Sequence, residues 1–172
     1  MNNAALINQD SGNYEYYTPS HIIELARTVM DGRIHTDPFS SPVANGRVKA
    51  SRIYTKEDDA LLPENKWTGN VWMNHPFGRE MNKKAIQKLI SEYRNGNMTQ
   101  ACCITFAATS EGWFMPLLAF PQCFIHGRTN YYLADGTLKK GVTKGSVVTY
   151  VGPEKNYERF KEVFSSIGTV KI

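Results

Sequence analysis

Apolar side chains recur at helical spacing in three long parts of the 172-residue chain. In residues 21–30 they fall every three or four positions after Thr-Pro-Ser, and Asp-Gly follows as a stop. Residues 81–97 repeat the pattern and close at Gly96, and residues 157–165 show it again. A shorter helix is expected at 113–120. The pattern therefore predicts three long helices and one short one.

Short apolar runs lie between these helices and predict strands. Two of them, at 33–36 and 71–73, end in turns that contain proline. The run from 101 to 107 is continuous, as expected of a central strand covered on both faces. Further strands are expected at 123–126, 129–133, 146–151 and 169–172. This alternation predicts an α/β sandwich with a largely parallel sheet, finished by hairpin-like strands.

The stretch between these two proline turns, residues 40–70, is polar, with short strand-like pieces such as 52–54. A connection of this length inside a compact domain usually has a function. Residues 1–13 are polar and aperiodic, which predicts a flexible N-terminal arm. The length suits a single domain, which we expect over residues 14–172.

The chain carries a modest excess of basic residues, 20 Lys and Arg against 16 Asp and Glu. This excess favours an anionic partner without deciding it. Four basic residues gather in one stretch with Tyr131 and Tyr132, a pattern that suits contact with a phosphate backbone and stacking on bases. A solvated hairpin explains the pattern equally well. The four are Arg128, Lys139, Lys140 and Lys144.

Several classes of protein are disfavoured by the composition. No apolar run approaches the roughly 20 residues that span a bilayer, so no membrane segment is expected. The N-terminus lacks the basic start and apolar core of a secretory signal, which predicts a cytoplasmic protein. Cys102 and Cys103 are adjacent in an apolar run and suit reduced, buried thiols. Without closely spaced His and Cys residues, no metal site is expected.

Candidate chemistry lies at two predicted strand ends, where ligands bind in α/β folds. At the first, Asp37 is fixed by Pro38, and its carboxylate can accept hydrogen bonds from hydroxyl or ammonium groups of a ligand. The chain has no glycine-rich phosphate-binding motif, which predicts a cofactor without a polyphosphate. Taken alone, an Asp-Pro turn is more often a simple strand terminator.

The second strand end reads Asn74-His75-Pro76-Phe77 and resembles the Asn/Asp-Pro-Pro-aromatic motif of amino-methyltransferases. An aromatic amino group is a poor nucleophile because its lone pair is delocalised into the ring. The Asn74 amide oxygen and the His75 main-chain carbonyl can accept its two hydrogens and raise its electron density. Phe77 can stack on a base flipped from the duplex. The alternative is a surface turn in which Asn caps and Phe packs.

An ordered set of further matches resembles the phage-type DNA adenine-N6 methyltransferase family, the phage Dam group. The resemblance is close over residues 14–78 and looser beyond, at Trp113-Phe114 and at 123–128. The matching residues are Tyr16-Tyr17-Thr18-Pro19, Asp37-Pro38-Phe39-Ser40, Ala44-Asn45, residues 54–59 with Leu61, Trp67, and residues 71–74.

The resemblance implies a Rossmann-like S-adenosylmethionine-dependent methyltransferase sandwich that methylates the N6 amino group of a flipped adenine in double-stranded DNA. It implies that Tyr17, Thr18 and Pro19 line the methionine end of the cofactor site. It also implies that Asp37, Pro38, Phe39 and Ser40 form the main cofactor turn, with Asp59 near the cofactor's adenine. For Asp59, a helix N-cap or a solvated acidic run is an equally good reading. Protection of a phage genome from host restriction is a further implication.

His75 departs from the resemblance because the family usually has proline there. Its carbonyl can still accept a hydrogen bond, but the backbone torsion is no longer fixed by a proline ring. An alternative is that the imidazole joins the site and alters the substrate or the group transferred. Two rival functions stay open: an inactive relative that binds DNA or cofactor, and an amino-methyltransferase acting on RNA, cytosine or protein. Recognition sequence and oligomeric state are not predicted.

Overall fold

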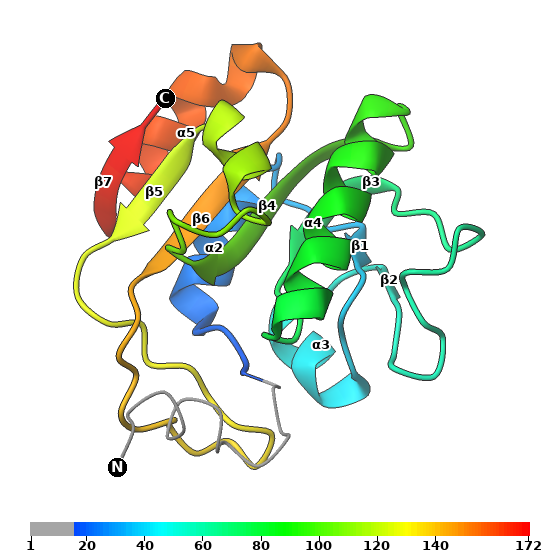
Figure 1. The fold of residues 1–172 in the computed structure, drawn as a ribbon, viewed down its shortest axis with the longest axis horizontal. Helices are drawn as coiled ribbons and strands as arrows, with labels where there is room; N and C mark the ends of the chain where they lie inside the picture. The colour runs from blue at the N-terminus through cyan, green and yellow to red at the C-terminus, as the bar shows by residue number, and fades with distance from the viewer. Residues whose placement is uncertain (1–15) are drawn as a thin grey trace.

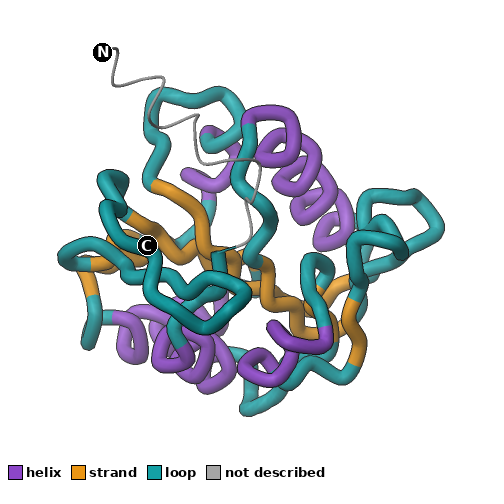
Figure 2. The backbone as a smooth tube through the Cα atoms, turned by 90° about the horizontal axis from the view of Figure 1, so that it is seen from below, coloured by secondary structure: helices purple, strands orange, loops and turns teal. Residues whose placement is uncertain are grey.

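The computed structural model describes residues 16–172, and the arm expected at 1–13 lies outside them. The described chain forms one seven-stranded sheet. Helices lie on both faces of this sheet, as Figures 1 and 2 show. The strands are β1 (Thr36–Asp37), β2 (Arg52–Ile53), β3 (Gly69–Met73), β4 (Met98–Phe106), β5 (Gln122–Ile125), β6 (Ser146–Val151) and β7 (Gly168–Lys171). Their spatial order is β2-β1-β3-β4-β6-β5-β7.

The two halves of this sheet differ in strand direction. Strands β2, β1, β3 and β4 pair in parallel. Strands β6, β5 and β7 continue the sheet through antiparallel pairings. The α/β class is confirmed, but the expected largely parallel sheet is parallel only in its N-terminal half. Hydrophobic pattern reports how deeply a strand is buried and not which way it runs.

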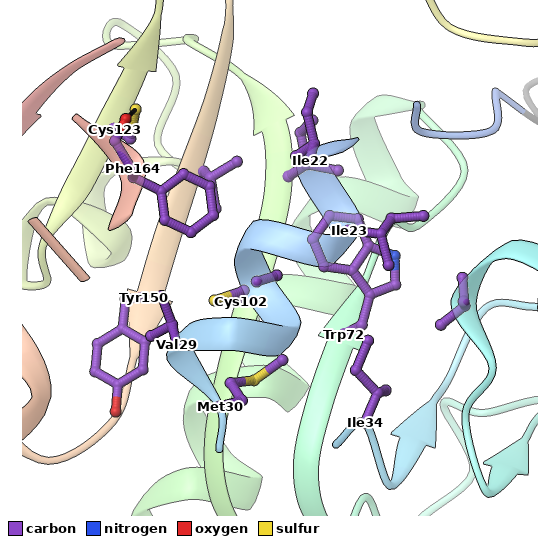
Figure 3. Close-up of a cluster of buried hydrophobic side chains, with 14 of the residues drawn as sticks. Ile22, Ile23, Val29, Met30, Ile34, Trp72, Cys102, Cys123, Tyr150 and Phe164 are labelled. Atoms are coloured by element: carbon purple, nitrogen blue, oxygen red, sulfur yellow. Dashed lines mark hydrogen bonds between the residues drawn. The ribbon is translucent and has the colours of Figure 1, made fainter. Parts of the chain in front are cut away.

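Helices cover each face of the sheet with a separate apolar layer. One face packs against α2 (Ser20–Val29) and α5 (Tyr157–Phe164), and the other against α4 (Arg79–Arg94) and the 3-10 helix η1 (Met115–Ala119). Along β3, Trp72 belongs to the α2 layer, whereas Val71 and Met73 belong to the α4 layer. Figure 3 shows Trp72 lying against Ile23 of α2. Each such apolar side chain contributes about 1.5–3 kcal/mol through full burial, so both layers fix the strand that leads into Asn74.

The expected helices at 21–30, 81–97 and 157–165 are confirmed as α2, α4 and α5, and η1 lies within 113–120. No helix among residues 16–172 is both long and apolar enough to cross a membrane. The three cysteines are free and buried.

Two expectations are wrong in detail. Residues 129–133 form no strand of the sheet, because Tyr132 makes only isolated pairings with Tyr17 and Leu138. The connection at 40–70 contains a helix, α3 (Pro42–Val48), which was not expected. Its start is locally encoded, since the Ser41 hydroxyl accepts a hydrogen bond from the Ala44 N–H at 3.1 Å and proline occupies the first turn. A second 3-10 helix, η2 (Glu154–Asn156), precedes α5.

The carboxyl ends of β1, β3 and β4 meet at one edge of the sheet, because these strands are parallel and adjacent. That edge carries Asp37, Asn74 and Phe106. The antiparallel β6 starts at the same edge, where Ser146 pairs with Phe106. The β5–β6 connection, yellow to orange in Figure 1, therefore extends past the edge that holds both candidate turns.

Candidate functional site

A cavity of about 430 Å³ opens at this edge of the sheet. Its walls come from the segment before α2, the turns after β1 and β3, helix α3, and residues 54–61. Ten of the predicted site residues line it: Tyr17, Thr18, Asp37, Pro38, Phe39, Ser40, Asp59, Asn74, His75 and Pro76. Six do not: Pro19, Phe77, Arg128, Lys139, Lys140 and Lys144. The fold thus brings the two motif turns, 37 residues apart in sequence, to a single pocket.

Asp37 ends β1 and is only 2% exposed. Its Oδ1 accepts a hydrogen bond from the Phe39 N–H at 3.2 Å, and its main-chain oxygen accepts one from the Tyr54 N–H at 3.0 Å. Burial raises the pKa of Asp37 to about 7, against the opposing effect of hydrogen bonds from the Phe39 N–H and the Ser40 hydroxyl. A positively charged ligand group beside this carboxyl would favour its ionised form.

Asn74 follows β3 and is held by contacts remote in sequence. Its amide nitrogen donates to the Tyr16 carbonyl at 2.6 Å and to the Thr18 hydroxyl at 3.0 Å. Because the Tyr16 carbonyl oxygen can only accept a hydrogen bond, it is the NH2 group of the Asn74 amide that faces the N-terminal segment. No described residue donates to Asn74 Oδ1. The oxygen is therefore left as an acceptor at the cavity wall.

His75 is 1% exposed and packs its ring edge-on against both Phe39 and Phe77, with centroids 6.2 and 6.0 Å away. Its Nε2 lies 2.6 Å from Asn82 Oδ1 on α4, an acceptor that makes Nε2 the donor. Burial lowers the pKa of His75 to about 4, against an upward effect of the Asn82 bond. The imidazole is therefore neutral at neutral pH, and packing together with α4 supplies the rigidity that proline would otherwise give.

Phe77 is buried beside the cavity and outside its lining. Its ring lies 4.3 Å from that of Phe106 and about 6 Å from those of Tyr16 and Tyr131. The Tyr131 hydroxyl lies 2.7 Å from Ser146 Oγ, which anchors this aromatic cluster to the first residue of β6. The stacking of Phe77 on a flipped base stays a prediction.

The basic residues of the β5–β6 connection divide into two groups. Lys144 Nζ lies 5.5 Å from the centre of the Phe106 ring, and Lys139 Nζ lies 5.8 Å from that of Tyr16, so both adjoin the aromatic cluster. Lys140 is exposed, and Arg128 lines a second cavity with His126. Lys139 and Lys144 are therefore the two that the fold brings next to the candidate turns.

Asp59 lies on the part of the cavity wall formed by residues 54–61. It is exposed, and its Oδ1 accepts a hydrogen bond from the Leu61 N–H at 3.1 Å. The residue lies between two turns, and no helix starts there in the described chain, so the N-cap reading does not hold.

Arg47 is a cavity residue that the sequence analysis missed. It belongs to α3, and its guanidinium carbon lies 4.1 Å from the centre of the Tyr132 ring. The available signal was Ser41-Pro42, because a capping serine followed by proline predicts a helix start. With Ala44 and Val48 on its buried side, that helix turns Arg47 toward the pocket.

No group of three His, Cys, Asp or Glu side chains in residues 16–172 is arranged to hold a metal ion. In a comparison with known families, a family model described as DNA N-6-adenine-methyltransferase (Dam) matches residues 9–168. The matched span contains both turns, α3 and the basic connection. None of the curated proteins compared with the chain matches it.

Proposed function

The chain belongs to the DNA N-6-adenine-methyltransferase (Dam) family, and from that premise we propose how its cavity serves the reaction. The activity is methylation of the N6 amino group of adenine in DNA, and the family implies S-adenosylmethionine as donor. One observation carries the assignment of the site: Asp37 and Asn74, at the ends of adjacent parallel strands, line the same pocket. We assign residues 14–172 to a single Rossmann-like methyltransferase domain.

The residues of the cavity fit S-adenosylmethionine. A volume of about 430 Å³ lies within the range of small-molecule sites, which is about 300–1,000 Å³. Buried Asp37 suits a ligand with ammonium and hydroxyl groups and no phosphate. In this proposal Pro38, Phe39 and Ser40 hold the cofactor with Asp37. Tyr17, Thr18 and Pro19 flank its methionine end, and Asp59 flanks its adenine. When bound, the sulfonium supplies an electrophilic methyl group.

The residues after β3 act on the adenine. Asn74 Oδ1 and the His75 carbonyl accept the two amino hydrogens and localise the nitrogen lone pair for attack on the methyl carbon. The nitrogen–carbon bond forms as the sulfur–carbon bond breaks, and the proton that the nitrogen loses passes to water. Pro76 and the packed His75 ring hold the turn, and Phe77 supports the base. Rate comes from positioning, without a covalent intermediate.

The basic connection holds the DNA backbone. Lys139 and Lys144 lie over the aromatic cluster that adjoins the Asn74 turn, so phosphates bound there bring the duplex to the pocket mouth. Lys140 and Arg128 extend the contact along the connection. We propose that the reaction takes place in the cytoplasm of a bacterial or phage-infected cell, where methylation of a phage genome protects it from restriction.

The test is incubation with double-stranded DNA and a methyl-labelled donor, followed by nucleoside analysis. We expect N6-methyladenine from the wild-type protein. Donor binding without any methylated nucleoside would reject the activity and favour an inactive binding relative. RNA, cytosine-only DNA and protein serve as competing substrates, and preferential labelling of one of them would replace adenine in DNA as the target.

A further inference from the structure

The guanidinium of Arg47 lies in the lining of the cavity and forms no ion pair with any described residue. Its Nη1 is buried without a hydrogen-bond partner among the described residues. A buried N–H without a partner costs free energy, and in the lining of a cavity a bound ligand can supply that partner. We infer that Arg47 binds the α-carboxylate of the methionine part of S-adenosylmethionine, an inference that rests on the proposed function.

The position of Arg47 is fixed before any ligand binds. Its guanidinium stacks on Tyr132, 4.1 Å from the ring centre. Tyr132 is itself paired with Tyr17 through two main-chain bonds, of 2.7 and 2.9 Å. Arg47 therefore stands at the Tyr17 end of the cavity, on the same helix that Ser41 caps. The Tyr17 hydroxyl lies 3.5 Å from Ser41 Oγ, so hydrogen-bond donors gather at this end.

Asp37 and Arg47 both line the pocket and suit the two charged groups of an amino acid. Asp37 offers an acceptor for an ammonium group, and Arg47 offers a planar set of donors for a carboxylate. The two do not neutralise each other, since no ion pair connects them. A DNA phosphate is the other anion available. It is the poorer match because Nη1 is buried in the pocket wall, whereas Arg128, Lys140 and Lys144 of the β5–β6 connection are exposed.

The experiment measures calorimetric affinity for S-adenosylhomocysteine and for its decarboxylated analogue, which differ only in the carboxylate. We expect wild-type protein to prefer S-adenosylhomocysteine. Arg47→Met should lower the affinity for S-adenosylhomocysteine by about tenfold to a hundredfold. Its affinity for the decarboxylated analogue should stay within about twofold of the wild-type value. Arg47→Lys keeps the charge but loses the planar set of donors, so its affinity for S-adenosylhomocysteine should lie between those of wild type and Arg47→Met.

Arg52→Met is the matched control, because Arg52 also stacks on a tyrosine, 5.2 Å from the Tyr54 ring centre, but is exposed and outside the cavity lining. It should bind both ligands as wild type does. The inference is overturned if Arg47→Met lowers the affinity for both ligands equally, since that result indicates a packing role. It is also overturned if Arg47→Met weakens only the binding of DNA. Wild-type protein that binds both ligands equally also overturns it. Wild-type protein that binds neither ligand rejects the proposed cofactor site itself. Arg47→Lys keeps the test usable if Arg47→Met does not fold.

Discussion

The turns after β1 and β3 occupy equivalent places, yet they are held in different ways. Both follow buried strands that pair in parallel, and both contain proline. The Asp37 side chain bonds within its own turn, to the Phe39 N–H. The Asn74 side chain bonds across 58 residues, to the Tyr16 carbonyl. The proposed cofactor turn is thus held by a contact within three residues, whereas the proposed adenine turn also depends on the N-terminal segment.

The largest expected effect comes from removing the Asn74 amide. Asn74→Ala deletes the oxygen that we propose accepts an amino hydrogen of adenine, and loss of one such contact costs about 10²–10³-fold in rate. Single-turnover methylation of DNA measures this loss, and calorimetry with S-adenosylhomocysteine measures cofactor binding, which we expect to change by less than about tenfold.

Two further variants sharpen this result. Asn74→Asp keeps an acceptor but turns a carboxylate toward the Tyr16 carbonyl, so we expect partial activity and a less stable protein. Asn95→Ala, at an exposed position after α4, should match wild type. Equal losses of methylation and cofactor binding in Asn74→Ala would contradict the division of labour between the two turns.

The second effect concerns Asp37. Asp37→Asn removes the carboxylate that we propose binds the cofactor, and we expect cofactor affinity to fall by about tenfold to a hundredfold. Methylation at saturating cofactor should fall much less. A large loss of methylation at saturating cofactor would mean that Asp37 also acts on the adenine.

Asp37 also sets a pH dependence of folding. Its pKa is about 7 in the folded protein against 3.8 ordinarily, so the folded state keeps its proton to higher pH than the unfolded chain. The associated stability is complete below pH 3.8 and is lost as pH rises through 7. Asn does not ionise, so the unfolding free energy of Asp37→Asn relative to wild type should rise from pH 4 to pH 8. Urea titrations at several pH values measure it, and a constant difference would contradict the raised pKa.

A smaller effect is expected outside both turns. Changing Lys139, Lys140 and Lys144 together to Ala should weaken binding to all DNA sequences and flatten its salt dependence, by roughly one slope unit for each lost phosphate contact. Cofactor affinity should stay unchanged. The control changes three exposed lysines remote from this edge: Lys155, Lys161 and Lys171. An equal change in both triple variants would remove the connection from the interface.

The smallest effect on the reaction is expected at His75. Its pKa is about 4 in the folded protein against 6.5 ordinarily, so wild-type stability is lost as pH falls from 6.5 to 4, where only the unfolded chain takes up the proton. His75→Gln should remove this dependence and gain stability relative to wild type over that window. Because His75 is neutral above pH 6, the cofactor-saturated rate should show no histidine titration there. A rate step near pH 6.5 that disappears in His75→Gln would show that the imidazole takes part in the chemistry.

Local signals in the sequence were enough for much of the fold. The period of apolar residues predicted α2, α4 and α5, because a helix is built from neighbours along the chain. Helix α3 could also have been predicted, because Ser41 and Pro42 are local signals for a helix start. The strand predicted at 129–133 is absent because local propensity does not fix tertiary packing. This segment packs Tyr131 against Phe106 in the aromatic cluster, and its backbone makes only isolated pairings.

The Asp37 turn and the order of the motifs could be predicted from the sequence, because Asp37, Pro38 and the Phe39 N–H lie within three residues of one another. Three features came from the folded chain alone: Asn74 faces Tyr16, Arg47 lines the same cavity, and the sheet becomes antiparallel at β6. Each of these depends on contacts between segments far apart in the chain. Their geometry is set by strand pairing and burial, which no local pattern specifies.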